Sequence, residues 1–191
     1  MEFKKIQLNG FKSFAEKTNF LIEDGLTGIV GPNGCGKSNI VESLRWAMGE
    51  TSAKSMRGSG MEDVIFNGTS NKASKNIAEV SIVVDNASHE GPLQYKDMDQ
   101  IEVRRKIEKD KGSKFYINDK EVRARDAQMF FADLSTGAHS PSMISQGRIG
   151  ALVTAKPTDR RAILEEAANI SGLHVRRHEA ELRLNAAEVN L

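Results

Sequence analysis

Residues 31–38 read Gly31-Pro32-Asn33-Gly34-Cys35-Gly36-Lys37-Ser38, and this stretch decides the fold. It fits G-x-x-x-x-G-K-[ST] at every fixed position, which is the pattern of a phosphate-binding loop between a strand and a helix. Gly34 and Gly36 let the backbone curl so that its amide hydrogens point at phosphate oxygens, and the helix dipole adds to their pull. Lys37 would neutralise the β- and γ-phosphates, and the Ser38 hydroxyl would ligate Mg²⁺. The loop therefore predicts an α/β nucleotide-binding core.

The segments on either side of the loop supply the context that the motif needs. Residues 26–30 are apolar and predict a strand that leads into the loop. Residues 37–48 predict a helix ended by Gly49, with four apolar residues on one face: Ile40, Val41, Leu44 and Ala47. Since a strand precedes the loop and a helix follows it, nucleotide binding is much better supported than a chance match in a glycine-rich turn.

The rest of the chain predicts an antiparallel sheet followed by helices. Strands are expected at residues 2–8, 20–22, 64–66, 78–84, 101–107 and 114–117. Asn118-Asp119 predicts a hairpin turn, residues 124–134 a helix and residues 135–150 a loop. A helix follows from Thr158, and beyond a break at Ser171-Gly172 a narrow apolar seam approaches a heptad pattern. We therefore expect one domain over residues 1–170 and the start of a truncated coiled coil over residues 171–191.

Composition narrows the class of protein. The chain has 191 residues, of which 39% are hydrophobic, enough for one or two compact domains. The net charge of +1 means that any DNA-binding surface would have to be a local patch. A single cysteine forms no internal disulfide and favours a reducing compartment. With no signal peptide and no apolar run near the ~20 residues of a membrane span, a cytoplasmic protein without a membrane partner is expected.

Two segments imitate parts that a complete ATPase would need. Residues 80–85 look like a strand ending in an acidic Mg²⁺ ligand, but Asn86 follows where a second acid would stand. We interpret Asp85 as the end of an antiparallel strand. Residues 134–137 are similar to the L-S-G-G signature of ABC-type ATPases, but they precede the glutamine loop at residues 144–147 instead of following it. Both missing parts are therefore expected on a separate stretch of chain.

Five segments carry a family resemblance. They are Gly10-Phe11-Lys12-Ser13-Phe14, the phosphate loop with Asn39, residues 53–58 with 61–66, Ile144-Ser145-Gln146-Gly147, and Asp159-Arg160-Arg161 with residues 165–168. In that order they resemble the opening motif, the Walker A loop, the arginine-finger segment, the Q-loop and the helix leading into the coiled coil of bacterial SMC (structural maintenance of chromosomes) proteins. The similarity extends from residue 2 to about residue 185.

The resemblance implies an architecture and a set of partners. The fold class would be an α/β ABC-type ATPase half-head with P-loop core strands, an antiparallel β-lobe and a coiled-coil stub. The C-terminal half of the same SMC protein would supply the signature and Walker B motifs. Two heads would form a homodimer around two ATP molecules with Mg²⁺, bridged by a kleisin subunit. The implied role is ATP-dependent chromosome organisation and segregation on DNA at the nucleoid. This fragment alone would be inactive.

The resemblance also implies a role for individual residues. Lys37, Gln146 and Arg57 would serve catalysis, with Gln146 sensing the γ-phosphate and Arg57 acting as a finger. Ser38 and Gln146 would hold the metal. Lys12 and Ser13 would line the base and ribose. The phosphates would lie against Pro32, Asn33, Gly34, Cys35, Gly36, Lys37, Ser38 and Asn39.

Two positions depart from the family pattern. Cys35 stands where serine is usual, and Gly60 stands where a DNA-contacting lysine is often found. The DNA surface is therefore not located by the sequence, although exposed bases could form it: Lys54, Lys72, Lys75, Arg123 and Arg125.

Three rival functions stay open at this point. The first is the head of a related double-strand-break repair ATPase, which the segment around Arg57 and the long helix after Arg160 disfavour. The second is a self-contained nucleotide kinase or GTPase, which would need its own acidic Mg²⁺ ligand after a parallel strand. The third is an interaction module whose phosphate loop binds nothing.

Overall fold

The computed structural model describes residues 1–89, 91–134, 143, 150 and 153–167, with 177, 180–181, 184–185 and 187–188 near the C-terminus. The elements within these residues are β1 (Glu2–Asn9), β2 (Thr18–Leu21), α1 (Lys37–Ala47), the 3-10 turns η1 (Lys54–Met56) and η2 (Met61–Val64), β3 (Ile77–Asp85), η3 (Leu93–Tyr95), β4 (Gln100–Glu108), β5 (Gly112–Ile117), β6 (Lys120–Val122), α2 (Ala124–Asp133) and α4 (Pro157–Ala167). Four predicted strands and the helices that start near residues 37, 124 and 158 are confirmed.

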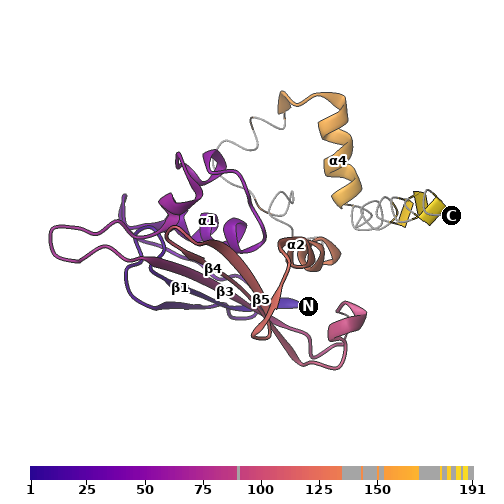
Figure 1. The fold of residues 1–191 in the computed structure, drawn as a ribbon, viewed down its shortest axis with the longest axis horizontal. Helices are drawn as coiled ribbons and strands as arrows, with labels where there is room; N and C mark the ends of the chain where they lie inside the picture. Colours follow the sequence, from indigo (N-terminus) through magenta and orange to yellow (C-terminus); the bar gives the residue numbers. More distant parts are fainter. Residues whose placement is uncertain are drawn as a thin grey trace.

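The centre of the fold is a six-stranded sheet in the order β2-β1-β3-β4-β5-β6, and every neighbouring pair is antiparallel (Figure 1). Its register aligns buried residues into rows that cross four strands. One row joins Ile6, Ile82, Val103 and Ile117. Since side chains alternate between the two faces of a strand, such rows give the sheet one continuous apolar face.

Two helices cover this sheet. α1 packs against β3 and β4, and α2 packs against β5 (Figure 1). Their large side chains Trp46, Phe130 and Phe131 are fully buried and join the same core as the strands. Each such side chain contributes on the order of 2–3 kcal/mol when it leaves water. The helix that follows the phosphate loop is therefore fixed to the sheet by packing.

The turn after β1 brings the chain back to α1. Gly10 has φ +63, and a Cβ at this position would lie 2.2 Å from the carbonyl oxygen of Ile77. Only glycine fits this close approach. Beyond it, Phe11 is buried and forms bridges to Phe14 and Ile65. This turn places Lys12 and Ser13 beside the helix that carries the phosphate loop.

The prediction of a strand at residues 26–30 was wrong. These residues form no strand, and Leu26 and Val30 are almost completely exposed. A strand persists only where a neighbour satisfies its backbone N–H and C=O groups. All six strands of the described sheet take their partners from within that sheet, and none of them pairs with residues 26–30. The P-loop core strands of the predicted fold are thus missing from the described residues.

Smaller corrections concern residues 20–22, residues 64–66 and the face of α1. The strand expected at 20–22 lies at 18–21, and residues 64–66 are the end of η2 and a single bridge from Ile65 to Phe11. On α1, Val41 and Leu44 are only partly buried, whereas Glu42 and Ser43 are buried. Glu42 can lie inside because cationic partners surround it. The Asn118-Asp119 turn is confirmed, with φ of 47 and 63.

The described residues contain no helix with the length and hydropathy needed to cross a membrane. The predicted loop at 135–150 and the predicted coiled coil at 171–191 lie largely outside the described residues.

Candidate nucleotide-binding site

The predicted phosphate loop is exposed and ends on α1. Gly36 is the N-cap of the helix with φ 98, and Gly34 has φ 82, so both occupy the left-handed region that favours glycine. No side chain caps the first turn of α1, and no acidic residue lies in it. Asn39 N–H donates to the carbonyl oxygen of Gly36, and the N–H groups before it could contact an anion.

The side chain of Lys37 folds back over the phosphate loop. Its ammonium group donates hydrogen bonds to the carbonyl oxygens of Gly31 and, at 2.7 Å, Pro32. The thiol of Cys35 lies 3.9 Å from the same ammonium group and is exposed. The cation is thus held over the loop by two backbone carbonyl oxygens, at a place where it could meet the phosphates of a nucleotide. The exposed Ser38 hydroxyl lies at the adjacent start of the helix.

Next to the loop, one buried carboxylate binds two cations. Glu42 is 8% exposed. Its Oε2 accepts a hydrogen bond from the Lys12 ammonium, and its Oε1 pairs with Nε of Arg57. Lys12 also donates to the carbonyl oxygen of Met56. Buried carboxylates require such partners, so this contact ties the turn after β1 and the segment around Arg57 to α1.

Asn39 extends this contact toward the phosphate loop. Its Oδ1 accepts a hydrogen bond from Nη2 of Arg57 at 3.0 Å, and its Nδ2 donates to Oγ of Ser13 at 2.9 Å. A Cβ at Gly36 would lie 2.5 Å from that same Oγ. The structure therefore brings together four predicted residues, which with Glu42 form what we call the Glu42 cluster: Lys12, Ser13, Asn39, Glu42 and Arg57.

Sequence reasoning missed Glu42. Its signal is an acidic residue one helical turn after Ser38, among apolar neighbours on the P-loop helix. Both cations that contact it also have an unusual backbone, with φ of 46 at Lys12 and 55 at Arg57. Each left-handed non-glycine residue costs on the order of 1 kcal/mol and persists where its surroundings fix it. Glu42 supplies part of that constraint.

A buried arginine fixes the other end of α1. Nη1 of Arg105 donates to the carbonyl oxygens of Trp46 and Glu50, each at 2.7 Å. Its guanidinium lies 4.5 Å from the Trp46 ring centre and 4.7 Å from that of Phe115. Burial lowers the pKa of Arg105 to about 10, although the negative charge of Glu50 opposes this shift. The helix is thus attached to β4 by hydrogen bonds and cation–π contacts.

The structure describes only one of the two predicted Mg²⁺ ligands. Gln146, the second expected Mg²⁺ ligand, lies outside the described residues. Within the part of the chain that the structure describes, no group of three or more His, Cys, Asp or Glu residues could hold a metal ion. Asp85 ends β3 and accepts a hydrogen bond from the N–H of Ala87, as expected of a strand end. Ser38 is therefore the described residue that fits a phosphate-bound Mg²⁺.

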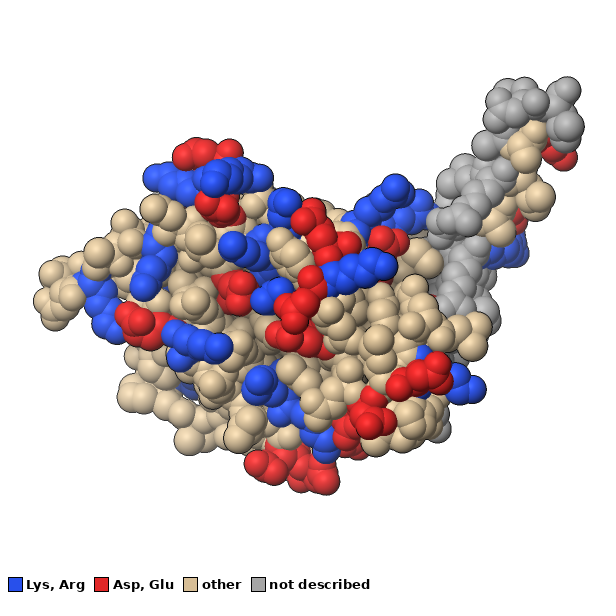
Figure 2. All heavy atoms as spheres, turned by 60° about the horizontal axis from the view of Figure 1, so that its bottom comes forward, with Lys and Arg blue, Asp and Glu red and all other residues tan. Residues whose placement is uncertain are grey.

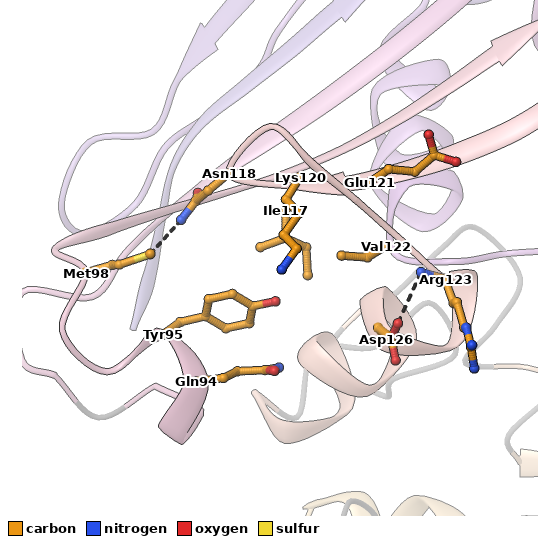
Figure 3. A pocket seen from close by; sticks show the side chains of 10 residues that line it. All are labelled: Gln94, Tyr95, Met98, Ile117, Asn118, Lys120, Glu121, Val122, Arg123 and Asp126. Atoms are coloured by element: carbon orange, nitrogen blue, oxygen red, sulfur yellow. Dashed lines mark hydrogen bonds between the residues drawn. The ribbon is translucent and has the colours of Figure 1, made fainter.

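A separate groove of about 830 Å³ opens between the loop before β4, the β5–β6 hairpin and α2 (Figure 3). Tyr95 and Met98 border it from the loop before β4, Val122 from β6, and Asp126 from α2. Burial, and secondarily the charge of Asp126, raises the pKa of Tyr95. One lysine, one arginine, one glutamate and one aspartate line the groove, and none of its lining residues belongs to the phosphate loop. It is not part of the nucleotide site.

Charge on the visible face is mixed. Figure 2 shows basic and acidic side chains interspersed over the body of the molecule, with no broad field of one sign. Lys72 pairs with Glu16 at 3.8 Å, and Lys114 pairs with Glu121 at 3.1 Å. The five candidate bases for DNA contact are all exposed: Lys54, Lys72, Lys75, Arg123 and Arg125. The structure does not single out a DNA surface among them.

Comparison with known sequences gives consistent matches. The profile of the family described as RecF/RecN/SMC N terminal domain matches residues 2–149. The chain is 59% identical over 191 residues to the chromosome partition protein Smc of Cereibacter sphaeroides, and 45% identical over 193 residues to that of Myxococcus xanthus. Both alignments cover the whole chain but only 17% and 16% of the relatives. The chain therefore spans about a sixth of the curated relatives it matches.

Solved structures give the same picture. A structure of the SmcHead bound to the C-winged helix domain of ScpA matches with a TM-score of 0.82 and 30% identity, covering 90% of this chain and 52% of that chain. An Smc head domain from Pyrococcus furiosus, bound to the C-terminal domain of ScpA, matches with a TM-score of 0.82 and 29% identity, covering 99% and 47%.

Proposed function

The chain belongs to the RecF/RecN/SMC N terminal domain family, and we propose that it is the N-terminal, ATP-binding half of an SMC head. The resemblance inferred from its motifs is confirmed, and its mixed α/β fold with an antiparallel six-stranded sheet matches solved SMC heads. The double-strand-break repair alternative is not favoured, because the relatives are chromosome partition proteins.

The observation that carries the proposal is the exposed phosphate loop on a helix held rigidly by the sheet. The phosphates of ATP would lie against residues 32–39, where uncapped helix N–H groups and the Lys37 ammonium meet. Ser38, with Gln146, would hold Mg²⁺, which when bound neutralises charge on the phosphate oxygens. Ser13 and Lys12 would border the nucleotide from the turn after β1.

Arg57 is the proposed finger. Asn39, one residue after Ser38, holds its guanidinium at 3.0 Å, so the group lies within one helical turn of the phosphate loop. Its side chain is 58% exposed. In the described part of the chain its Nη1 has no hydrogen-bond partner, which leaves donors for phosphate oxygens. Its positive charge would stabilise the negative charge that develops during transfer of the γ-phosphoryl group.

The proposed partners follow from the similarity to chromosome partition proteins and to solved SMC heads. The C-terminal half of the same protein would bring Walker B and signature motifs, and two heads would engage around two ATP molecules. A solved SMC head is bound to the kleisin ScpA, which supports a kleisin partner here. The relatives' name supports action on DNA at the nucleoid. ATP-dependent engagement of the heads would then serve chromosome organisation and segregation.

Both other rivals are less well supported. A self-contained kinase or GTPase needs its own acidic Mg²⁺ ligand after a parallel strand, whereas the candidate Asp85 ends β3, which is antiparallel to both of its neighbours. An interaction module with an inactive loop would differ from the proposed half-head in one measurable property, since it would not bind nucleotide.

Nucleotide binding and turnover test the proposal directly. We expect the 191-residue chain alone to hydrolyse ATP negligibly and the addition of the C-terminal half to restore turnover. Lys37→Ala in the reconstituted head removes a charge-assisted phosphate contact worth about 1.5–3 kcal/mol. Calorimetry should therefore show ATP affinity at least about tenfold weaker. Unchanged affinity would remove Lys37 from the site, and full turnover by the isolated chain would refute the split-site architecture.

A further inference from the structure

We propose that Glu42 is a positioning residue for Arg57, and that it holds the arginine beside the phosphate loop through a carboxylate shared with Lys12. The inference rests on the proposed function, because it assumes that Arg57 acts on the nucleotide. It assigns a role to a residue that carries none in the sequence motifs.

The geometry of the shared carboxylate is specific. Each of its oxygens meets a different cation, Oε1 the guanidinium Nε of Arg57 and Oε2 the ammonium of Lys12. Asn39 and Glu42 are three residues apart on α1 and therefore lie on one face of the helix. Together they hold two of the five N–H donors of Arg57, at Nη2 and Nε. The guanidinium is thus fixed along one edge while its remaining edge stays exposed.

Lys12 strengthens this arrangement by a second route. Its ammonium also donates a hydrogen bond to the carbonyl oxygen of Met56, and Met56 directly precedes Arg57. The backbone before Arg57 and the side chain of Arg57 are therefore both anchored to the pair formed by Lys12 and Glu42. The left-handed backbone of Arg57, φ 55 and ψ 36, directs its side chain back toward α1 and is consistent with such a two-point anchor.

Burial separates this contact from an ordinary surface ion pair. The side chains of Lys12 and Glu42 are 13% and 11% exposed. A pair that is largely removed from water is weakly screened and keeps its geometry. The preorganised fork leaves less entropy to lose when phosphate oxygens bind, which is the advantage of positioning a catalytic cation in advance.

The test is a double-mutant cycle in the complete protein with both head halves. Variants Glu42→Gln, Arg57→Ala and the double variant are compared for kcat, for KM of ATP and for ADP affinity by calorimetry. Glu42→Gln keeps the shape but removes the charge shared by the two cations. We expect kcat to fall roughly tenfold or more, as misplacement of a catalytic group does, while ADP affinity changes less than about twofold. In the Arg57→Ala background the same substitution should cost less than about twofold, because residues that act together are not additive.

Controls separate positioning from folding. Glu121→Gln removes an exposed carboxylate paired with Lys114 at the β5–β6 hairpin and should leave kcat unchanged. If Glu42→Gln does not fold, Glu42→Asp keeps the charge but withdraws the carboxylate by one methylene, and the same cycle is run with it.

Three outcomes would overturn either the positioning role of Glu42 or the proposed role of Arg57. Wild-type kcat in Glu42→Gln, together with a large loss in Arg57→Ala, refutes the positioning role of Glu42 alone. Fully multiplicative losses in the double variant do the same, because Glu42 would then act independently of Arg57. Wild-type kcat in Arg57→Ala refutes the proposed role of Arg57 itself.

Discussion

Two segments of this chain have the apolar character of strands, and only one of them forms a strand. In β3, Val84 is buried and pairs with Phe3 of β1 and Ile101 of β4. In residues 26–30, Val30 is 93% exposed and belongs to no strand. The residue type is the same, so the difference lies in whether a neighbouring strand is available. Each strand of the β-lobe finds its partners within the described residues, while the segment that leads into the phosphate loop finds none there.

This difference bears on the split head that we propose. The contacts that hold α1 and the Glu42 cluster to the β-lobe lie within the described residues. The apolar residues before the loop remain exposed, and a large exposed apolar segment usually marks a contact surface.

The largest effect is expected for Val84→Asp in the 191-residue chain. The new carboxylate would lie in an apolar row against Phe3 and Ile101, two rows from the Arg105 guanidinium. Burying an unpaired charge costs several kcal/mol, so we expect a loss of more than about 4 kcal/mol in the free energy of unfolding. Urea unfolding followed by circular dichroism measures it. A wild-type midpoint would show that the β-lobe core is not where the structure places it.

A smaller loss is expected for Arg105→Leu. The substitution leaves the carbonyl oxygens of Trp46 and Glu50 without their buried donor and removes two cation–π contacts. The loss should be about 3 kcal/mol. Arg104→Leu is the matched control. Arg104 forms a partly exposed pair with Asp119 at 2.6 Å and one cation–π contact with Tyr116, and its loss should cost only about 1 kcal/mol. Equal losses in the two variants would contradict the clamp on α1.

The sequence could predict those parts of the fold that neighbouring residues decide. Strands β3 and β4 follow from alternation, and the Asn118-Asp119 turn follows from two residues that tolerate positive φ. The phosphate loop follows from its glycines and Lys37. These features depend on local chemistry that the sequence states directly.

The sequence could not predict what distant partners decide. Residues 26–30 have strand character, but no local pattern shows whether a neighbour is present. Burial of Glu42 depends on Lys12 and Arg57, which are 30 and 15 residues away and are brought near by two left-handed turns. The expected helical face on α1 was displaced for the same reason, because ion pairing allowed a carboxylate to lie inside.

A modest, pH-dependent effect is expected for Asp63→Asn in η2, shortly after Arg57. Asp63 accepts hydrogen bonds from the N–H of Gly60 and from the N–H and hydroxyl of Ser59, and these hold the pKa of its carboxyl below the usual value of 3.8. A lowered carboxylate pKa stabilises the fold above pH 3.8, and this contribution is lost as pH falls through the folded value. The wild type should therefore lose stability below about pH 4 more steeply than Asp63→Asn. Parallel acid unfolding curves would show that these hydrogen bonds do not bear on stability.

The smallest effect on stability is expected for Val30→Asp. In the 191-residue chain the side chain of Val30 is almost fully exposed, so a carboxylate at this position would not be buried. The free energy of unfolding should therefore change by less than about 0.5 kcal/mol, in contrast to Val84→Asp. In the proposed head, however, residues 26–30 would pair with the C-terminal half, and a carboxylate there would be buried at that contact. The Kd between the two halves, measured by calorimetry, should then rise at least about tenfold. Leu93→Asp, at another almost fully exposed apolar residue, is the control and should change neither quantity. A loss of chain stability as large as that of Val84→Asp would mean that the segment packs within this chain, and an unchanged Kd would mean that the C-terminal half does not cover it.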